Sequence, residues 1–222
     1  MKKMTSFSLL MMVILFLFTG GCNPKIEPIF GEMTDARDGQ TYKTVTLGDQ
    51  TWLAQNMNYE TDANSWCYQD KPENCDNYGR LYTWEEALTV CPDGWHLASD
   101  AEWSTLIKFL DPQASPDNVL VESKTAGGML KATGTIEDKT GLWRKPNTGA
   151  TNVSGFSAVP GGNRFPTGFF NQLGNLTMFW TSTEYNDKSV WFRYLDYGVG
   201  GVYRDNTVIT KDYGVSVRCI MD

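Results

Sequence analysis

Histidine is nearly absent from this chain of 222 residues, which contains only His96. No two of its five cysteines form a C-x-x-C pair. Because structural zinc sites combine closely spaced cysteines and histidines, both scarcities argue against a zinc cluster. His96 stands between Trp95 and Leu97 just before an expected helix, a setting more typical of a structural histidine than of a general acid or base. No motif therefore singles out an enzymatic group.

A hydrophobic run long enough to cross a bilayer is also lacking. The run from Phe7 to Phe18 is shorter than the roughly 20 residues that a spanning helix needs. Two lysines precede it and Thr19-Gly20-Gly21-Cys22 follows, which is the order of a secretory signal peptide. Residues 1–21 are therefore predicted to be a signal peptide.

The small residues directly before Cys22 resemble the lipobox of bacterial lipoproteins, in which the cysteine receives lipid and becomes the mature N-terminus. This resemblance implies a lipid anchor on Cys22 and a place on the cell envelope, at the outer membrane or cell surface. Thr19 stands where the lipobox usually has leucine, so an ordinary secretory signal with an incidental cysteine remains the alternative.

Basic residues are few. Removal of residues 1–21 takes away two of the 19 lysines and arginines and none of the 26 acidic residues, leaving 17 against 26 and a net charge of −9. A nucleic-acid partner would require a basic stripe. The composition thus excludes nucleic acid as an expected ligand.

Four cysteines remain when Cys22 is set aside, an even number that suits an oxidising compartment. Of the three possible connectivities, we favour Cys67 with Cys75 and Cys91 with Cys219. The first closes a short polar loop, and the second ties the middle of the domain to its last strand. In the chain-entropy model the longer closure contributes about 4–5 kcal/mol to stability.

The pattern along the chain predicts one α+β domain with two helices, an antiparallel sheet and long loops. Residues 22–34 are expected to be a tether and residues 35–222 the domain. Residues 42–47 and 50–54 read as a hairpin around Gly48-Asp49. Capping boxes at Thr83 and Ser99 predict the starts of the two helices. Strand composition recurs in four later segments, residues 189–194, 201–204, 207–210 and 214–220.

An ordered series of motifs resembles a known family. The series comprises Asp38-Gly39-Gln40-Thr41-Tyr42, Trp52-Leu53-Ala54-Gln55-Asn56-Met57, Tyr78-Gly79-Arg80-Leu81-Tyr82, Cys91-Pro92-Asp93-Gly94-Trp95-His96-Leu97, Trp180-Thr181-Ser182-Thr183-Glu184 and Ser216-Val217-Arg218-Cys219. It resembles the Fibrobacter succinogenes major paralogous domain, found on secreted proteins and lipoproteins of Bacteroidetes and Fibrobacter, over residues 35–222. More distantly it is similar to the C-type lectin-like fold and that of the formylglycine-generating enzyme. The resemblance implies such a fold, braced by Cys91 and Cys219.

Aromatic residues in loop-like contexts are the best candidates for a binding surface. The segment from Arg164 to Trp180 is aromatic and glycine-rich, so Arg164, Phe165, Phe169, Phe170 and Trp180 are the expected contact residues. The alternative is that these rings cover the core, as aromatics of loop-rich domains usually do.

The sequence thus favours a non-catalytic, surface-anchored binding module whose ligand is a polysaccharide or another surface protein. Two alternatives remain open: an extracytoplasmic hydrolase or modifying enzyme that uses loop carboxylates, and a structural adhesin or assembly subunit. No cofactor is expected. A structural calcium ion stays open because oxygen ligands are plentiful in the loops.

The lipid anchor can be tested directly by mass spectrometry of the mature protein purified from membranes. We expect an N-terminal Cys22 that carries acyl chains, because those chains would hold the domain at the membrane surface. A Cys22→Ser variant should be released without lipid. An unmodified Cys22 inside a longer mature chain would contradict the prediction.

Overall fold

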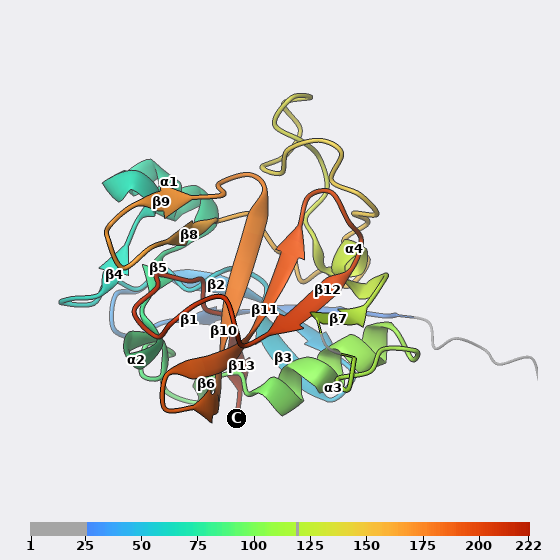
Figure 1. The fold of residues 1–222 in the computed structure, drawn as a ribbon, viewed down its shortest axis with the longest axis horizontal. Helices are drawn as coiled ribbons and strands as arrows, with labels where there is room; N and C mark the ends of the chain where they lie inside the picture. The colour runs from blue at the N-terminus through green and yellow to red at the C-terminus, as the bar shows by residue number, and fades with distance from the viewer. Residues whose placement is uncertain (1–25, 119) are drawn as a thin grey trace, which may run out of the picture.

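Two antiparallel sheets, joined by loops and short helices, form the domain in the computed structural model, which describes residues 26–118 and 120–222 (Figure 1). The predicted signal peptide and Cys22 lie outside the described residues. Within those residues, no helix combines the length and apolar character that crossing a bilayer requires.

The larger sheet brings the two ends of the domain together. Its strands, in spatial order, are β1 (Ile29–Thr34), β2 (Thr41–Leu47), β3 (Gln50–Leu53), β13 (Cys219–Met221) and β6 (Trp95–Leu97). Leu47 pairs with Gln50 in the antiparallel β2–β3 register, so the predicted hairpin is confirmed. The closing strand β13 lies between β3 and β6.

The tether is shorter than the sequence predicts. Residues 29–34, expected to be part of it, form β1 and pair with β2 from Ile29 opposite Thr46 to Thr34 opposite Thr41. The backbone pairing of all six residues with β2 accounts for the difference, and the Phe30 ring also lies beside Gly155, where an added Cβ would come within 2.3 Å of it. Ile26 also packs against the core. The ordered domain therefore begins before residue 35.

The second sheet is formed from the C-terminal half and one earlier strand. Its order is β10 (Leu176–Asn186), β11 (Ser189–Asp196), β12 (Val202–Asp205) and β7 (Leu120–Ser123). The segments predicted at 189–194 and 201–204 are thus strands. The strand predicted at 207–210 is wrong, because Asp205 accepts hydrogen bonds from the backbone of Asn206 and the backbone and hydroxyl of Thr207, which turns the chain.

Four short helices and two small strand pairs complete the fold. They are α1 (Pro72–Tyr78), α2 (Trp84–Ala87), α3 (Asp100–Leu110), α4 (Ala126–Leu130), β4 (Ser65–Trp66) with β5 (Leu81–Tyr82), and β8 (Asn163–Arg164) with β9 (Phe170–Asn171). At α3 the predicted capping box is confirmed, with Ser99 and Glu102 bonded reciprocally. The box at Thr83 does not form: its side chain makes no cap hydrogen bond, and its backbone N–H, which the box would pair with Glu86, donates to the carbonyl of Asn64. The sequence did not predict α1 and α4.

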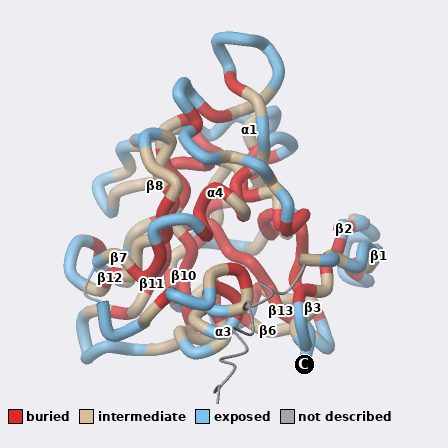
Figure 2. Tube along the Cα trace, turned by 90° about the vertical axis from the view of Figure 1, so that its right-hand side faces the viewer, coloured by how far each residue is buried: buried red, intermediate tan, exposed pale blue. Residues whose placement is uncertain are grey.

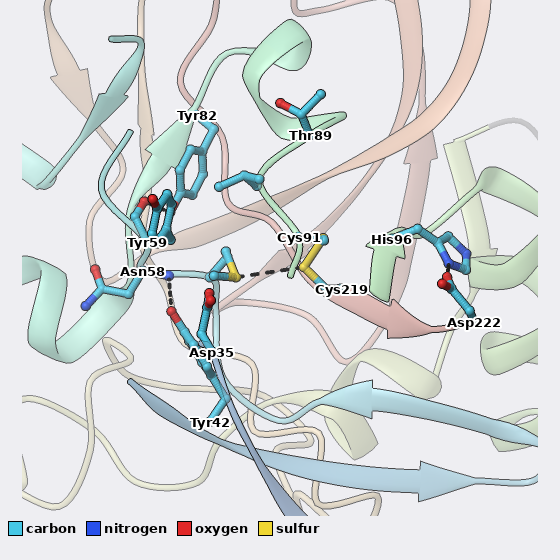
Figure 3. The surroundings of a disulfide bond; sticks show 12 residues. Asp35, Tyr42, Asn58, Tyr59, Tyr82, Thr89, Cys91, His96, Cys219 and Asp222 are labelled. Carbon is cyan, nitrogen blue, oxygen red and sulfur yellow. Dashed lines mark hydrogen bonds and ion pairs between the residues drawn. A yellow bond between two sulfur atoms is a disulfide. The ribbon is translucent and has the colours of Figure 1, made fainter. Parts of the chain in front are cut away.

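Both predicted disulfides are confirmed. Cys67 is bonded to Cys75 across eight positions, where α1 begins after a single 3-10 turn. Cys91 is bonded to Cys219 across 128 positions, and Figure 3 shows this bridge close to β13. The first therefore fixes a local loop, whereas the second connects the middle of the chain to the closing strand.

Aromatic side chains fill the centre of the molecule. Trp52 and Phe156 contact Trp103 of α3, with ring centroids 4.9 and 5.6 Å from the Trp103 centroid, and Phe179 of β10 lies 5.2 Å from it. All four side chains are buried. Strands β10 and β11 run through this interior, as Figure 2 shows. Burial of such rings provides the dominant stabilising contribution.

The last segment is buried on both of its faces. Val215, Val217 and Cys219 are buried as the alternation predicts, but Ser216 and Arg218 are buried as well. Arg218 donates hydrogen bonds to the carbonyls of Leu53, Phe156 and Ser157 and to Asn56 Oδ1, at 2.6–3.1 Å. Burial without a carboxylate partner lowers its pKa to about 9.

Arg218→Met should destabilise the domain strongly. Methionine fills similar space but donates no hydrogen bonds, and each buried acceptor left unsatisfied costs about 1–3 kcal/mol. With four acceptors affected, we expect the free energy of unfolding to fall by at least about 3 kcal/mol in urea denaturation. The exposed Arg144 offers a matched control, since Arg144→Met should change the free energy of unfolding by less than about 0.5 kcal/mol. Equal effects of the two substitutions would contradict this account.

Candidate functional site

Four of the five residues predicted to bind lie together on the β8–β9 hairpin. Arg164 pairs with Phe170, and the N–H of Phe165 donates to the carbonyl of Phe169 at 2.8 Å. The rings of Phe165 and Phe169 lie 6.1 Å apart, and Phe165 is 5.1 Å from Tyr213. Phe169 is 65% exposed. The hairpin therefore presents aromatic surface to solvent.

Trp180 is not part of this surface, which corrects the prediction. Its side chain is completely buried, and Nε1 donates to the carbonyl of Tyr82 at 2.8 Å. The residue belongs to β10, the strand that crosses the core, rather than to a loop. Trp143, also in a loop-like sequence context, is equally buried. The alternative that loop-like aromatics cover the core holds for these two tryptophans.

Arg164 connects the hairpin to a second aromatic group. Its guanidinium lies 4.0 Å from the ring centre of Trp66 in β4 and 5.7 Å from that of Phe170. The Phe170 ring in turn contacts Tyr68 at 5.2 Å. Trp66 and Tyr68 flank Cys67, so the Cys67–Cys75 disulfide holds both rings in place. Arg164 thus bridges segments about one hundred residues apart in sequence.

Trp66 also borders a hollow of about 720 Å³. We call it the Trp66 hollow; its wall includes Arg37, Asn58, Tyr59, Glu60, Trp66 and Arg80. Arg37 is held by Asp35 through two contacts of 2.7 and 2.9 Å, and its guanidinium lies 3.9 Å from the Tyr59 ring centre. Arg80 pairs with Glu60 at 2.8 Å. Aromatic rings and planar polar groups therefore share one wall.

Two polar atoms in this wall are buried without hydrogen-bond partners among the described residues. They are Oδ1 of Asn58, an acceptor, and Nε of Arg80, a donor. The backbone N–H of Asn58 donates to the hydroxyl of Tyr42 at 3.1 Å, which positions the residue, as Figure 3 shows. Unsatisfied buried groups are rare in proteins and call for a partner. A hydroxyl group suits both atoms because it donates and accepts.

The carboxyl groups show no sign of general-acid chemistry. Every carboxyl whose pKa is displaced within residues 26–118 and 120–222 is displaced downward, namely Asp35, Asp100, Glu102, Asp111 and Asp138. Hydrogen bonds from Arg37 and Lys145 lower the pKa values of Asp35 and Asp138. At the other three, burial raises the pKa, but hydrogen bonds and nearby cations outweigh it. A glycosidase acid requires the opposite displacement.

His96 lies in the larger sheet, and the Trp66 hollow does not include it. Nδ1 contacts Asp222 at 2.6 Å and Nε2 contacts Glu102 at 2.9 Å, as Figure 3 shows for Asp222. Glu102 is the residue that caps α3. The histidine therefore links strand, helix and closing segment, as the structural interpretation of His96 expects.

The described residues contain no cluster of three or more His, Cys, Asp or Glu side chains suited to a metal ion. Calcium can also bind amide and carbonyl oxygens, so a structural calcium ion stays a prediction.

The sequence analysis did not connect Trp66 and Tyr68 with Arg164. It missed Asn58, Tyr59 and Arg80 altogether. Asn56-Met57 and Tyr78-Gly79-Arg80 belong to the motifs quoted above, and the hollow lies directly beside them. The available signal was that Asn58 and Tyr59 directly follow the first of these motifs and that Arg80 lies within the second.

Comparison with known proteins supports the family resemblance. The family model described as Fibrobacter succinogenes major domain matches residues 45–221, which include both disulfides and most of the Trp66 hollow. Searches of curated proteins and of solved structures return no significant match.

The contacts of His96 predict a pH-dependent contribution to stability. Burial alone lowers its pKa, but hydrogen bonds and the charges of Asp222 and Glu102 outweigh burial and raise it above its usual 6.5. The stabilising contribution is therefore complete below about pH 6.5 and is lost as pH rises through the higher folded-state value. His96→Gln should cost more free energy of unfolding near pH 6 than near pH 9. A cost that does not change with pH would refute this.

Proposed function

This chain belongs to the Fibrobacter succinogenes major domain family, and we propose that it is a non-catalytic carbohydrate-binding module displayed on a lipid anchor at the cell surface. The observation that carries the proposal is the convergence, in the Trp66 hollow, of aromatic rings with two unpartnered polar atoms. Sugars combine apolar C–H faces, which stack on rings, with hydroxyl groups that donate and accept hydrogen bonds.

Charge favours a sugar that carries no negative charge. The mature chain has a net charge of −9, and four carboxyl groups, from Asp38, Glu60, Asp70 and Asp76, border the hollow with only two arginines. An anionic ligand would meet repulsion there. Where the pKa of a carboxyl group among the described residues is displaced, it is lowered, which favours binding over hydrolysis, because a general acid needs a raised pKa.

We further propose that the fold is related to C-type lectin-like domains. In support, helices α2 and α3 precede a loop-rich region and a closing antiparallel sheet, and Cys91–Cys219 joins the region between those helices to the last strand. The lipid on Cys22 would keep this domain within reach of polysaccharide outside the cell.

The proposal can be tested on an array of neutral and acidic glycans with the purified, lipid-free domain. We expect retention on neutral glycans and loss of most of it in Trp66→Ala, because this change removes the ring that borders the hollow. Tyr185→Ala is a matched control, since Tyr185 is an exposed aromatic outside the hollow.

Trp66→Ala could also disturb the stack with Arg164, so a second variant is needed. Glu60→Ala changes a side chain that is 75% exposed and still releases Arg80 from its ion pair. Reduced glycan retention in both variants, with unchanged thermal unfolding of Glu60→Ala, would support the site. A silent array together with specific capture of another surface protein would overturn the carbohydrate proposal.

A further inference from the structure

A second hollow, of about 620 Å³, adjoins the Trp66 hollow. Strands β1 and β2, helix α1 and the loop from Asn152 to Val159 surround it. We call it the amide hollow because its wall contains six carboxamide side chains, Gln40, Gln55, Asn56, Asn58, Asn77 and Asn152. Both hollows fall within the size range of ligand sites, about 300–1,000 Å³.

The two hollows meet at Asn58 and the middle of helix α1. Asn58, Cys75 and Asp76 border both hollows, so the two spaces share one segment of wall. Cys75 is fixed there by its disulfide to Cys67, beside Trp66. A ligand long enough to pass Asn58 would therefore contact the walls of both hollows.

The floor of the amide hollow is rigid. Asn56 accepts a hydrogen bond from the buried Arg218 at 2.7 Å and donates to the carbonyl of Tyr78 at 2.8 Å. Next to it, Gly79 has a φ of 74°, and an added Cβ would come 2.6 Å from the Cβ of Asn56. A larger residue could not approach so closely. Such pre-organisation lowers the entropic cost of binding.

Other amides at the rim keep hydrogen-bonding capacity. Gln55 accepts a hydrogen bond from the backbone of Lys43 at 2.8 Å, and Asn77 donates to the carbonyl of Glu73 at 2.9 Å. The remaining amide atom of each has no partner in the described part of the chain. Because a carboxamide offers both donors and an acceptor, it matches neighbouring hydroxyl groups without requiring charge.

We infer that the two hollows form one extended site that binds a neutral oligosaccharide chain of several sugar units, with a ring stacked at Trp66 and further units held by the amides. The inference rests on the proposed function and adds the length and neutrality of the ligand. Lys43 is the only cation bordering the amide hollow, against Glu32 and Asp76, so this half of the site also disfavours an acidic chain.

Calorimetric titration with neutral oligosaccharide ladders, from disaccharide to octasaccharide, tests the extended site. The ladders would contain β-1,4-linked glucose, xylose or mannose. For the wild-type domain we expect the affinity to rise at least about tenfold with length before it levels off, which corresponds to one or two additional net hydrogen bonds.

A double substitution separates the two halves. Gln55→Ala with Asn77→Ala should abolish the gain with length but leave disaccharide binding unchanged, because it truncates only amides of the amide hollow. The control, Lys71→Ala with Glu73→Ala, changes exposed residues of the same region that border neither hollow and should keep the gain. Both variants can be compared with the wild type by thermal unfolding.

Each outcome is informative. Affinity that is independent of chain length, or a length gain that survives the amide substitutions, would overturn the extended site and leave the proposed function standing. Tighter binding of a uronic-acid ladder would overturn neutrality. An absence of binding by every ladder and every arrayed glycan would instead overturn the proposed function itself.

Discussion

The buried guanidinium of Arg218 is the interaction on which the rest of the domain depends. It joins the segment that closes the chain to β3 through Leu53 and to the central loop through Phe156 and Ser157. These partners are neutral carbonyls, so the charge is stabilised by dipoles rather than by an ion pair. Such an arrangement is costly to desolvate and tolerates little displacement, because each acceptor would lose its only strong donor. Together with the Cys91–Cys219 disulfide, this side chain fixes the closing segment relative to the interior.

The same arginine reaches the candidate site through Asn56. Its hydrogen bond orients this amide at the floor of the amide hollow, while Cys67–Cys75 fixes the wall that the two hollows share. The wall of the proposed site is therefore supported by a buried charge on one side and a covalent link on the other. Short strands and loops carry most of the remaining wall, so without these two supports their positions would have few constraints.

The parts of the fold that the sequence predicted correctly are those with a local or countable signal. Ser99 and Glu102 lie three residues apart, so their capping box can be read directly. The even number of cysteines limited the pairings to three, and the β2–β3 hairpin follows from its turn. Trp180 was misplaced because a short aromatic run in a glycine-rich context looks the same in a loop and in a fully buried strand. Strand β1 was missed because its pairing with β2 and the contact of Phe30 with the distant Gly155 have no local signal.

The candidate site was only half predictable for a related reason. The β8–β9 aromatics are sequence neighbours, so composition located them, whereas Asn58, Arg80 and Trp66 come together through the pairing of Trp66 with Leu81 and the bond from Arg80 N–H to the carbonyl of Met57. Burial leaves one atom of each of Asn58 and Arg80 without a partner among the described residues, as it also does at Trp103, Asn147, Arg164 and Thr177, but among these residues only Asn58 and Arg80 border the Trp66 hollow. That property depends on every surrounding group and has no counterpart in residue type or spacing. The proximity of these two atoms to Trp66 is thus visible only in three dimensions, and it is the observation on which the proposed carbohydrate site rests.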